Sequence, residues 1–431
     1  MKFETICVVG LGYIGLPTAT VIASQGVKVV GLEANPATIA TINRGDVHII
    51  EPDLDEAVRM VVEKGLLQAT DIAEPADAFM IAVPTPFQDD HQPDLSYIAA
   101  ACRSIAPVLQ RGNLVILEST SPVGATEQMA QWLSDHRPDL TFPQQNGDDS
   151  DIRIAHCPER VLPGKVLHEL VDNDRIIGGM TPRCSDAAVA LYAIFVEGDC
   201  IVTNARTAEM CKLSENSFRD VNIAFANELS IICDRLDINV WELIALANRH
   251  PRVQILQPGP GVGGHCIAVD PWFIVSSAPE EARLIRTARE VNDAKPEWVL
   301  AAVDTAITNV RKLRHDTAEP ITVACLGLAF KPDIDDLRES PALEICRRLT
   351  QLPNCRIIAV EPNIPALPRT LVDIATFEDA GTAIEHADVV VVLVDHSPFK
   401  DITLGMLQDK QLVDTRGLFS RDITARVVST G

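Results

Sequence analysis

The chain has 431 residues, 47% of them hydrophobic and 23% charged, which is typical of a globular protein with two or three domains. Its formal net charge of −23 argues against binding to nucleic acid, whose phosphates would be repelled. Its longest apolar runs, such as Val389–Val394, have the length of a strand and are too short to cross a membrane.

The start of the sequence and its cysteines predict the compartment. No basic segment or cleavage site precedes the first apolar run, so we expect no signal peptide and a cytoplasmic location. The eleven cysteines are scattered, without a CxxC pair or a His/Cys spacing typical of a zinc site. We therefore expect reduced thiols rather than disulfides, and no bound metal.

The texture of the chain changes twice. Residues 1–202 alternate short β-branched runs with amphipathic stretches, and we expect buried parallel strands at residues 5–9, 27–32, 78–83 and 114–117. Residues 203–312 look helical, with one long helix over 207–236 and a second over 282–310 that Pro296 should break or kink. Strands return in residues 313–431, at 321–327, 355–361, 388–394 and 411–414. The pattern predicts an α/β fold of two Rossmann-like, doubly wound domains joined by a central helical domain.

Three glycines directly after the first predicted strand indicate a dinucleotide site. Gly10 permits a tight turn, Gly12 lets a pyrophosphate approach the backbone, and Gly15 lets helix and strand pack closely. Glu33 ends the next predicted strand, where an acid holds the adenosine ribose. Because no arginine follows in Glu33–Pro36 to accept a 2′-phosphate, the motif favours NAD over NADP. The alternative is a tight turn that binds nothing.

Two more predicted strands end in segments rich in hydroxyl groups and proline, Val83–Pro86 and Glu118–Gly124. The carboxyl ends of parallel strands are where such sheets meet their ligands. Ser, Thr and Pro are equally typical of ordinary turns, so both interpretations stay open.

Cys266 lies in the glycine-rich segment Gly259–Asp270. Such a segment lets backbone approach a ligand, and its amides can stabilise a thiolate or an oxyanion. A hydride acceptor together with a nucleophilic thiol suggests a four-electron dehydrogenase, which oxidises a primary alcohol through a thiohemiacetal and a thioester to an acid. Asp270 is a candidate for proton handling. The alternative is a structural glycine loop with an incidental thiol.

The long helix carries Glu209, Lys212, Asn216 and Arg219 at three- and four-residue intervals, so they share one side. If this side lines a cleft, Lys212 can act as an acid/base; otherwise it is a solvated stripe. Further basic residues stand in predicted loops and are candidates to clamp a pyrophosphate, or else surface charges: Arg160, Arg249, Arg252 and Lys331.

Six segments in order resemble motifs of the UDP-glucose/GDP-mannose dehydrogenase family, and the resemblance covers essentially the whole chain: Gly10–Pro17, Val83–Pro86, Cys157–Arg160, Lys212–Asn216, Gly261–Cys266 and Gly327–Pro332. It implies an NAD-binding domain (1–202), a central domain with the cysteine loop (203–312) and a UDP-sugar-binding domain (313–431). It also implies a homodimer through the long central helix and oxidation of a UDP-sugar at C6.

The resemblance assigns a role to each candidate site residue. It implies the nucleophile Cys266, the acid/base Lys212, the assisting Asp270, the hydrolysis-step Glu159 and the water-binding Thr120. The cofactor would contact Gly10, Gly12, Tyr13, Ile14, Gly15, Glu33, Thr85, Thr126 and Arg338. The UDP-sugar would contact Arg160, Val161, Lys212, Asn216, Arg219, His250, Arg252, Gly263 and Lys331.

Two segments reduce the number of UDP-sugars to consider as the substrate. UDP-glucose dehydrogenases carry Pro-Lys where this chain has Ala268-Val269, and segments 248–252 and 265–272 resemble the branch that oxidises UDP-N-acetyl-D-mannosamine. The resemblance thus implies UDP-N-acetyl-D-mannosaminuronate as product, made for surface polysaccharide. The alternatives are UDP-glucose or UDP-N-acetylglucosamine as substrate, a two-electron hydroxyacid dehydrogenase, and an NAD-binding sensor without catalysis.

Overall fold

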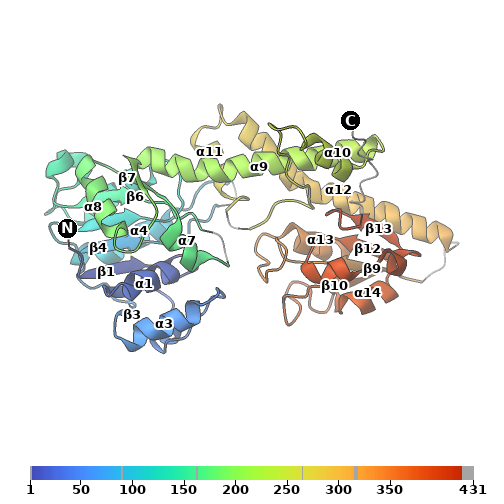
Figure 1. Ribbon diagram of the computed structural model, residues 1–431, viewed down its shortest axis with the longest axis horizontal. Coiled ribbons are helices and arrows are strands. Elements are labelled where there is room, and N and C mark those ends of the chain that lie inside the picture. Colours follow the sequence, from blue (N-terminus) through green and yellow to red (C-terminus); the bar gives the residue numbers. More distant parts are fainter. Residues whose placement is uncertain (1, 89–90, 162–163, 265, 315–318, 420–431) are drawn as a thin grey trace, which may run out of the picture. The chain divides into compact units, whose positions relative to one another are not determined.

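The computed structural model describes residues 2–88, 91–161, 164–264, 266–314 and 319–419. Two compact units make up the chain: Met1–Glu215 with Trp272–Pro279, and Asn216–Pro271 with Glu280–Gly431 (Figure 1). His265, a member of two of the motif segments, lies outside the described residues.

The first unit contains an eight-stranded sheet in the order β3-β2-β1-β4-β5-β6-β7-β8. Its strands pair in parallel except β6 with β7, which are antiparallel. The four predicted strands are confirmed as β1 (Thr5–Val9), β2 (Lys28–Leu32), β4 (Ala78–Ile81) and β5 (Leu114–Leu117). The pattern did not single out β3 (Leu67–Thr70), β6 (Arg153–His156), β7 (Arg175–Gly179) and β8 (Cys200–Asn204).

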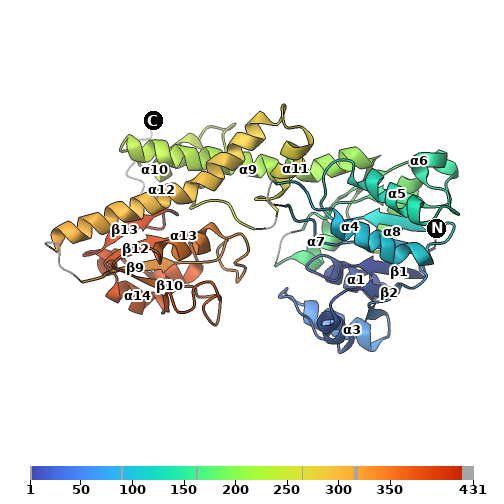
Figure 2. The same ribbon diagram turned by 180° about the vertical axis from the view of Figure 1, so that it is seen from behind.

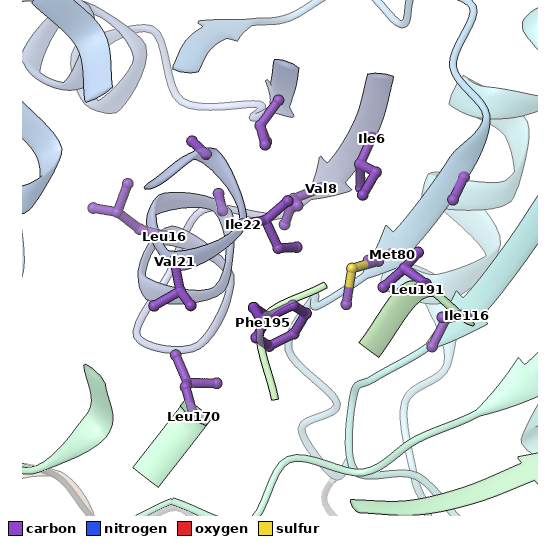
Figure 3. Close-up of a cluster of buried hydrophobic side chains, with 14 of the residues drawn as sticks. Ile6, Val8, Leu16, Val21, Ile22, Met80, Ile116, Leu170, Leu191 and Phe195 are labelled. Atoms are coloured by element: carbon purple, nitrogen blue, oxygen red, sulfur yellow. The ribbon is translucent and has the colours of Figure 1, made fainter. Parts of the chain in front are cut away.

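Successive side chains of a strand point to opposite faces of the sheet, and in the central strands both sets are apolar and buried. Helices therefore cover both faces. Ile6 and Val8 face a cluster that includes Leu16 and Ile22, with α7 and α8 on the same side (Figure 3). Their neighbours on β1 pack on the other face, against α4 and α5 (Figure 2). The helices that lie wholly in this unit are α1 (Gly15–Ser24), α2 (Pro36–Asn43), α3 (Leu54–Glu63), α4 (Ser96–Ile105), α5 (Ala125–His136), α6 (Pro143–Asn146), α7 (Val166–Asp172) and α8 (Pro182–Tyr192).

Both predicted long helices are confirmed, as α9 (Ala205–Arg235) and α12 (Arg283–Leu313). Pro296 lies inside α12 and does not end it, so a break at this residue is wrong, and the alternative of a kink stays a prediction. Proline removes the N–H that would donate to the carbonyl of Asn292 and crowds that carbonyl, but buried side chains on both sides of Pro296 keep the helix packed. Between the long helices lie α10 (Val240–Ala247) and α11 (Asp270–Ser277).

The second unit contains a five-stranded parallel sheet in the order β11-β10-β9-β12-β13. Helices α12 and α13 (Pro341–Leu349) pack on one face and α14 (Ala380–His386) on the other (Figure 1). The predicted strands are confirmed as β9 (Ile321–Leu326), β10 (Cys355–Val360), β12 (Val389–Val392) and β13 (Gln411–Asp414), and β11 (Thr376–Phe377) is added. The fold class of two Rossmann-like sheets with a helical middle is confirmed; the predicted domain limits stay a prediction.

Candidate active site

Each of the three glycines between β1 and α1 has its own steric reason. Gly10 has a φ of +87°, and a Cβ on it would lie 2.8 Å from the carbonyl oxygen of Ala82. A Cβ on Gly15 would lie 1.8 Å from the carbonyl oxygen of Gly10. Gly12 is exposed, and a Cβ there would meet no protein atom within 4 Å. The turn therefore packs tightly below and leaves its outer backbone open, which fits the pyrophosphate of a dinucleotide at the start of α1.

Gly12→Ala should therefore separate cofactor binding from folding. We expect an unchanged midpoint of thermal unfolding, because the added methyl meets no protein atom, and an NAD affinity at least about tenfold weaker, ~1.4 kcal/mol. Isothermal titration with NAD measures the affinity. Gly405→Ala, at another exposed glycine with no atom closer than 3.7 Å to a Cβ, is the matched control and should change neither quantity. Equal NAD affinity in both variants would place the pyrophosphate elsewhere.

Glu33 holds the same turn from the end of β2. Its Oε2 accepts the backbone N–H of Leu11 at 3.0 Å, and its Oε1 accepts those of Ala34 and Asn35 at 2.9 and 3.0 Å. The carboxylate is thus fixed at the rim of the glycine turn, where a ribose would bind. His48, which the sequence pattern did not single out, faces this carboxylate: burial lowers the pKa of its imidazole and the charge of Glu33 opposes the change.

The other predicted cofactor and water ligands of this unit lie on neighbouring turns. Tyr13, 40% exposed, and the half-buried Ile14 stand between Gly12 and α1. The segments after β4 and β5 are joined by the hydroxyl of Thr85, which donates to the carbonyl of Thr120 at 2.5 Å. Both threonines are half-buried. The structure therefore brings together the two hydroxyl-rich segments for which the sequence allowed either a ligand contact or an ordinary turn.

Glu209 of α9 holds the loop that begins α5. Its carboxylate accepts the N–H of Gly124 at 2.7 Å, the N–H of Thr126 at 2.8 Å and the hydroxyl of Thr126 at 2.6 Å. Burial raises the pKa of Glu209, and these hydrogen bonds oppose the rise. The buried hydroxyl of Thr126 is thus committed to Glu209, and Glu209 is a positioning residue for the loop that also carries Thr120.

Glu159 follows β6 and is buried against β7. Its Oε2 accepts Nη1 of Arg175 at 2.6 Å, and its Oε1 accepts the backbone N–H of Arg160 at 2.6 Å. The side chain of Arg160 turns to α9, where its Nη2 lies 2.8 Å from Oε1 of Glu215. Val161 comes next and is half-buried. Arg175, 1% exposed, is a fixing residue that sequence reasoning missed.

The polar side of α9 is not a uniformly solvated stripe. Glu209 and Asn216 are buried, Lys212 between them is half-buried, and Arg219 is exposed. A buried polar residue needs a partner, which Glu209 and Asn216 have. Lys212 is thus not on a fully solvated face, and its role in a cleft stays a prediction.

In the second unit, Cys266 and Asp270 share one turn. The carbonyl of Cys266 accepts the N–H groups of Val269 at 3.1 Å and Asp270 at 2.9 Å, and α11 begins at Asp270. The side chain of Cys266 is exposed. Asp270 is buried, and its Oδ2 accepts Nδ2 of Asn216 at 2.5 Å. Two of the predicted site residues, Asn216 and Asp270, are thus in direct contact.

The glycines before Cys266 pack against the segment after β9. A Cβ on Gly263 would lie 2.4 Å from the carbonyl oxygen of Glu339, and one on Gly264 would lie 2.9 Å from the ring of Phe330. The N–H of Gly264 donates to the carbonyl of Arg338 at 3.2 Å. These glycines therefore have a packing reason of their own, and they place the cysteine segment beside a predicted cofactor residue, Arg338.

A buried polar seam between α9 and α12 supports the start of this segment. Asp220 accepts Nη1 of Arg289 at 2.6 Å and Nδ2 of Asn292 at 2.8 Å. Asn292 in turn accepts Nδ2 of Asn227 at 2.8 Å, and Oδ1 of Asn227 accepts the N–H of Gly259 at 2.9 Å. The seam links a charge pair in the helices to the first glycine of the cysteine segment.

An acid–imidazole pair holds the loop that carries Lys331. Oε2 of Glu361, at the end of β10, accepts the N–H of Ala329 at 3.0 Å and lies 3.0 Å from Nε2 of His396. Nδ1 of His396 accepts the N–H of Asp333 at 2.9 Å, so the buried imidazole donates through Nε2. Lys331 is exposed between these two anchored residues. Sequence reasoning singled out neither Glu361 nor His396.

The remaining predicted residues are on the surface of the second unit. His250 and Arg252 follow α10, and the N–H of Arg252 donates to Nδ1 of His250 at 3.3 Å. Arg219 is exposed on α9, and Arg338 is ion-paired with Asp336, Nη2 to Oδ2, at 2.6 Å. Their roles stay predictions. Within the described ranges, no group of three His, Cys, Asp or Glu side chains is arranged to hold a metal ion.

Family models match three consecutive parts of the chain. Residues 4–196 match the NAD binding domain, 206–294 the central domain and 324–421 the UDP binding domain of the UDP-glucose/GDP-mannose dehydrogenase family. The chain belongs to this family. This nucleotide-sugar dehydrogenase is therefore an oxidoreductase that acts on CH–OH groups with NAD, and the resemblance of its six motif segments is confirmed.

Whole-length relatives agree with the family. The chain is 62% identical to a UDP-N-acetyl-D-mannosamine dehydrogenase of Yersinia pestis, over 97% of this chain and 100% of that protein. It is 64% identical to an NDP-N-acetyl-D-galactosaminuronic acid dehydrogenase of Ralstonia nicotianae, over 97% of both. Among solved structures, a UDP-D-ManNAc dehydrogenase of Pyrococcus horikoshii is similar at a TM-score of 0.85 and 38% identity, over 98% of both chains. Among the described helices of this dehydrogenase, none is both long and apolar enough to span a bilayer.

Proposed function

We propose that the enzyme oxidises C6 of UDP-N-acetyl-D-mannosamine to a carboxylate, through a covalent thioester on Cys266. One observation carries the proposal: an NAD-dependent dehydrogenase presents an exposed thiol on a glycine segment, one turn before a buried aspartate. The overall change is R–CH2OH + 2 NAD+ + H2O → R–COO− + 2 NADH + 3 H+. The substrate is supported by relatives with this name at 60–62% identity and by the sequence segments 248–252 and 265–272.

The residues divide the work between the two oxidations. Gly10, Gly12, Gly15 and Glu33 would hold NAD, which would supply the hydride acceptor for both oxidations at C6, that of the alcohol and that of the cysteine adduct. Lys212 takes the proton of the C6 hydroxyl as the aldehyde forms. The sulfur of Cys266 then bonds to C6, and the aldehyde oxygen becomes the hydroxyl of a thiohemiacetal. Loss of that hydroxyl proton with the second hydride leaves the thioester.

Hydrolysis ends the cycle. A water held by Thr120 or Glu159 attacks the thioester carbonyl, the C–S bond breaks, and the thiol of Cys266 is restored as the acid leaves. Asp270, fixed by Asn216, assists the proton transfers. The UDP-sugar itself would be held by the predicted contacts Arg160, Val161, Asn216, Arg219, His250, Arg252, Gly263 and Lys331. Covalent capture keeps the aldehyde from escaping between the two oxidations.

The decisive assay counts NADH for each UDP-sugar consumed. We expect two; a two-electron hydroxyacid dehydrogenase gives one, and a sensor without catalysis gives none. A panel of UDP-N-acetyl-D-mannosamine, UDP-N-acetylgalactosamine, UDP-N-acetylglucosamine and UDP-glucose then ranks the substrates by kcat/KM. UDP-N-acetylgalactosamine is the second candidate because the Ralstonia relatives, at 63–64% identity, are named NDP-N-acetyl-D-galactosaminuronic acid dehydrogenases. A stoichiometry of one for every sugar would refute the thioester route.

We also propose a homodimer through α9. Phe218, Phe225 and Ile232 recur at seven-residue intervals on this helix and are 70%, 53% and 43% exposed. Residues seven apart lie on the same side of a helix, so a large apolar stripe stays in water unless a second copy covers it. The same helix carries Lys212 and Asn216, so association would also stiffen the site.

Phe218→Glu should therefore convert the dimer to a monomer. A buried charge at the centre of a two-fold interface is repeated in both copies and is strongly unfavourable. Light scattering coupled to size exclusion measures the mass. Leu404→Glu, at a residue 59% exposed in the second sheet domain, is the control and should leave the mass unchanged. An unaltered dimer in the Phe218 variant would contradict an interface on this side of α9.

A further inference from the structure

Two carboxyl groups and one guanidinium are buried together beside the ends of β5 and β6. Glu118 and Glu159 are 1% and 6% exposed, Arg175 on β7 is 1% exposed, and Tyr192 on α8 is fully buried. A buried carboxylate needs a counter-charge or several donors. Because one guanidinium faces two carboxyl groups, the contacts of each acid decide which of the two is ionised.

The contacts of the two acids are unequal. Glu159 accepts Nη1 of Arg175 at 2.6 Å and a backbone N–H at 2.6 Å. Glu118 accepts only the hydroxyl of Tyr192, at 3.3 Å on Oε1, and among the described residues its buried Oε2 has no hydrogen-bond partner. A second hydrogen bond of Arg175, from Nη2 to the carbonyl of Leu170 at 2.9 Å, fixes the guanidinium toward Glu159. The positive charge of Arg175 is thus paired with Glu159, and Glu118 accepts a single long hydrogen bond from a neutral hydroxyl group.

The charged and titratable groups that face Glu118 come from three elements. They are Glu159 after β6, Arg175 on β7 and Tyr192 on α8. Burial, and after it the charge of Glu159, raise the pKa of Glu118, while Arg175 and Tyr192 oppose the rise; together these effects raise the pKa to about 8. Burial also raises the pKa of Tyr192 and of the adjacent Cys157, so neither supplies a charge near neutral pH. Arg175 is the positive charge that faces this pair of acids.

We propose that Glu118 is protonated in the working enzyme and is a positioning residue. A neutral Glu118 leaves Arg175 paired with Glu159 alone, and this pairing orients the carboxylate of Glu159 for the hydrolysis step that forms the acid. The inference rests on the proposed role of Glu159 in hydrolysis. If Glu118 ionises, a second carboxylate competes for Arg175, and Glu159 loses its fixed orientation. Glu118 then acts as a built-in limit on acid formation at alkaline pH.

Glu118→Gln tests this directly, because glutamine keeps the shape of the neutral acid and cannot ionise. We expect the variant to form acid in a single turnover at nearly the wild-type rate near pH 7, and to outpace the wild type increasingly as the pH rises through about 8. Glu127→Gln, at a partly exposed carboxyl of α5 paired with Arg206, is the control and should follow the wild-type profile. A tenfold loss near pH 7 in a folded variant, or profiles that superpose, would overturn the proposal.

Two measurements without substrate separate this inference from the proposed function. Infrared difference spectra of wild type and Glu118→Gln should contain the C=O stretch of a protonated carboxylic acid near pH 7; its absence would overturn the proposal. The pKa of Glu118 is higher in the folded than in the unfolded chain. The stability that the neutral acid confers is therefore fully present at pH values below the ordinary pKa of a glutamate, and it is lost as the pH rises to about 8. The midpoint of thermal unfolding of Glu118→Gln should therefore rise relative to that of the wild type as the pH increases from about 5 to about 8. Failure of the NADH stoichiometry alone would reject the hydrolysis role of Glu159 and leave these two results standing.

Discussion

Replacing Cys266 with serine should lower the rate of acid formation by roughly 10³- to 10⁶-fold, as expected when a covalent nucleophile is removed. The hydroxyl cannot form the thioester, so oxidation stops at the aldehyde and the NADH formed per sugar falls from two towards one. Cys266 is exposed and precedes the buried Asp270 by one turn, so the exchange of sulfur for oxygen should not disturb the fold. Product analysis by mass spectrometry together with NADH absorbance measures both effects.

Cys200→Ser is the matched control. Cys200 is half-buried in β8, and its replacement should change neither the rate nor the stoichiometry. A thioester adduct on Cys266 should also accumulate in wild-type enzyme quenched during turnover. Full acid formation by the Cys266 variant would sink the covalent mechanism, whatever its effect on stability.

Arg289→Met should be the most destabilising of these changes. It removes the guanidinium that donates to Asp220 at 2.6 Å and leaves a fully buried carboxylate whose donors, among the residues that the structure describes, come from Asn292 alone. Breaking a buried ion pair from one side costs about 3–5 kcal/mol. The midpoint of thermal unfolding should fall by several degrees. Arg283→Met, at an exposed arginine on the same helix, should stay within about 0.5 kcal/mol of the wild type.

The loss should depend on pH in a defined direction. Burial raises the pKa of Asp220, and Arg289 opposes that rise. Without Arg289 the pKa of the folded state rises further above the unfolded value, so the variant loses stability as the pH increases through it. The difference between variant and wild type should therefore be smallest in acid and largest at neutral pH. A constant difference from about pH 4 to pH 8 would show that packing, not charge, dominates the effect.

Local patterns predicted a large part of the fold. The central strands β1, β4 and β5 are buried on both faces, so each is a continuous apolar run that a sequence reveals. Strand β8 is partly exposed along its whole length and sits at the sheet edge, and its apolar run, residues 200–202, is short, so the pattern did not single it out. Gly10 and Gly15 could be interpreted from sequence because their reason is steric and lies within one turn.

Partners distant in sequence could not be predicted. Glu33 and Glu361 do the same work, each ending the second strand of a parallel βαβ unit and accepting backbone N–H groups of the turn after the first strand. Only the first was singled out, because a glycine fingerprint precedes it and no full fingerprint precedes Glu361. Arg175 is an ordinary arginine in the sequence until β7 places it against Glu159.

The sequence by itself determined the two parallel sheets, the long helices, the nicotinamide cofactor and the cysteine segment, because periodicity, glycine sterics and motif order are properties of neighbouring residues. Only the tertiary structure decided which buried charges are satisfied: Glu209 by the loop after β5, Asp220 by α12, and Glu159 rather than Glu118 by Arg175. The physical reason is that the energy of a buried charge depends on the groups that folding brings around it, and those groups come from segments that chain order does not place together.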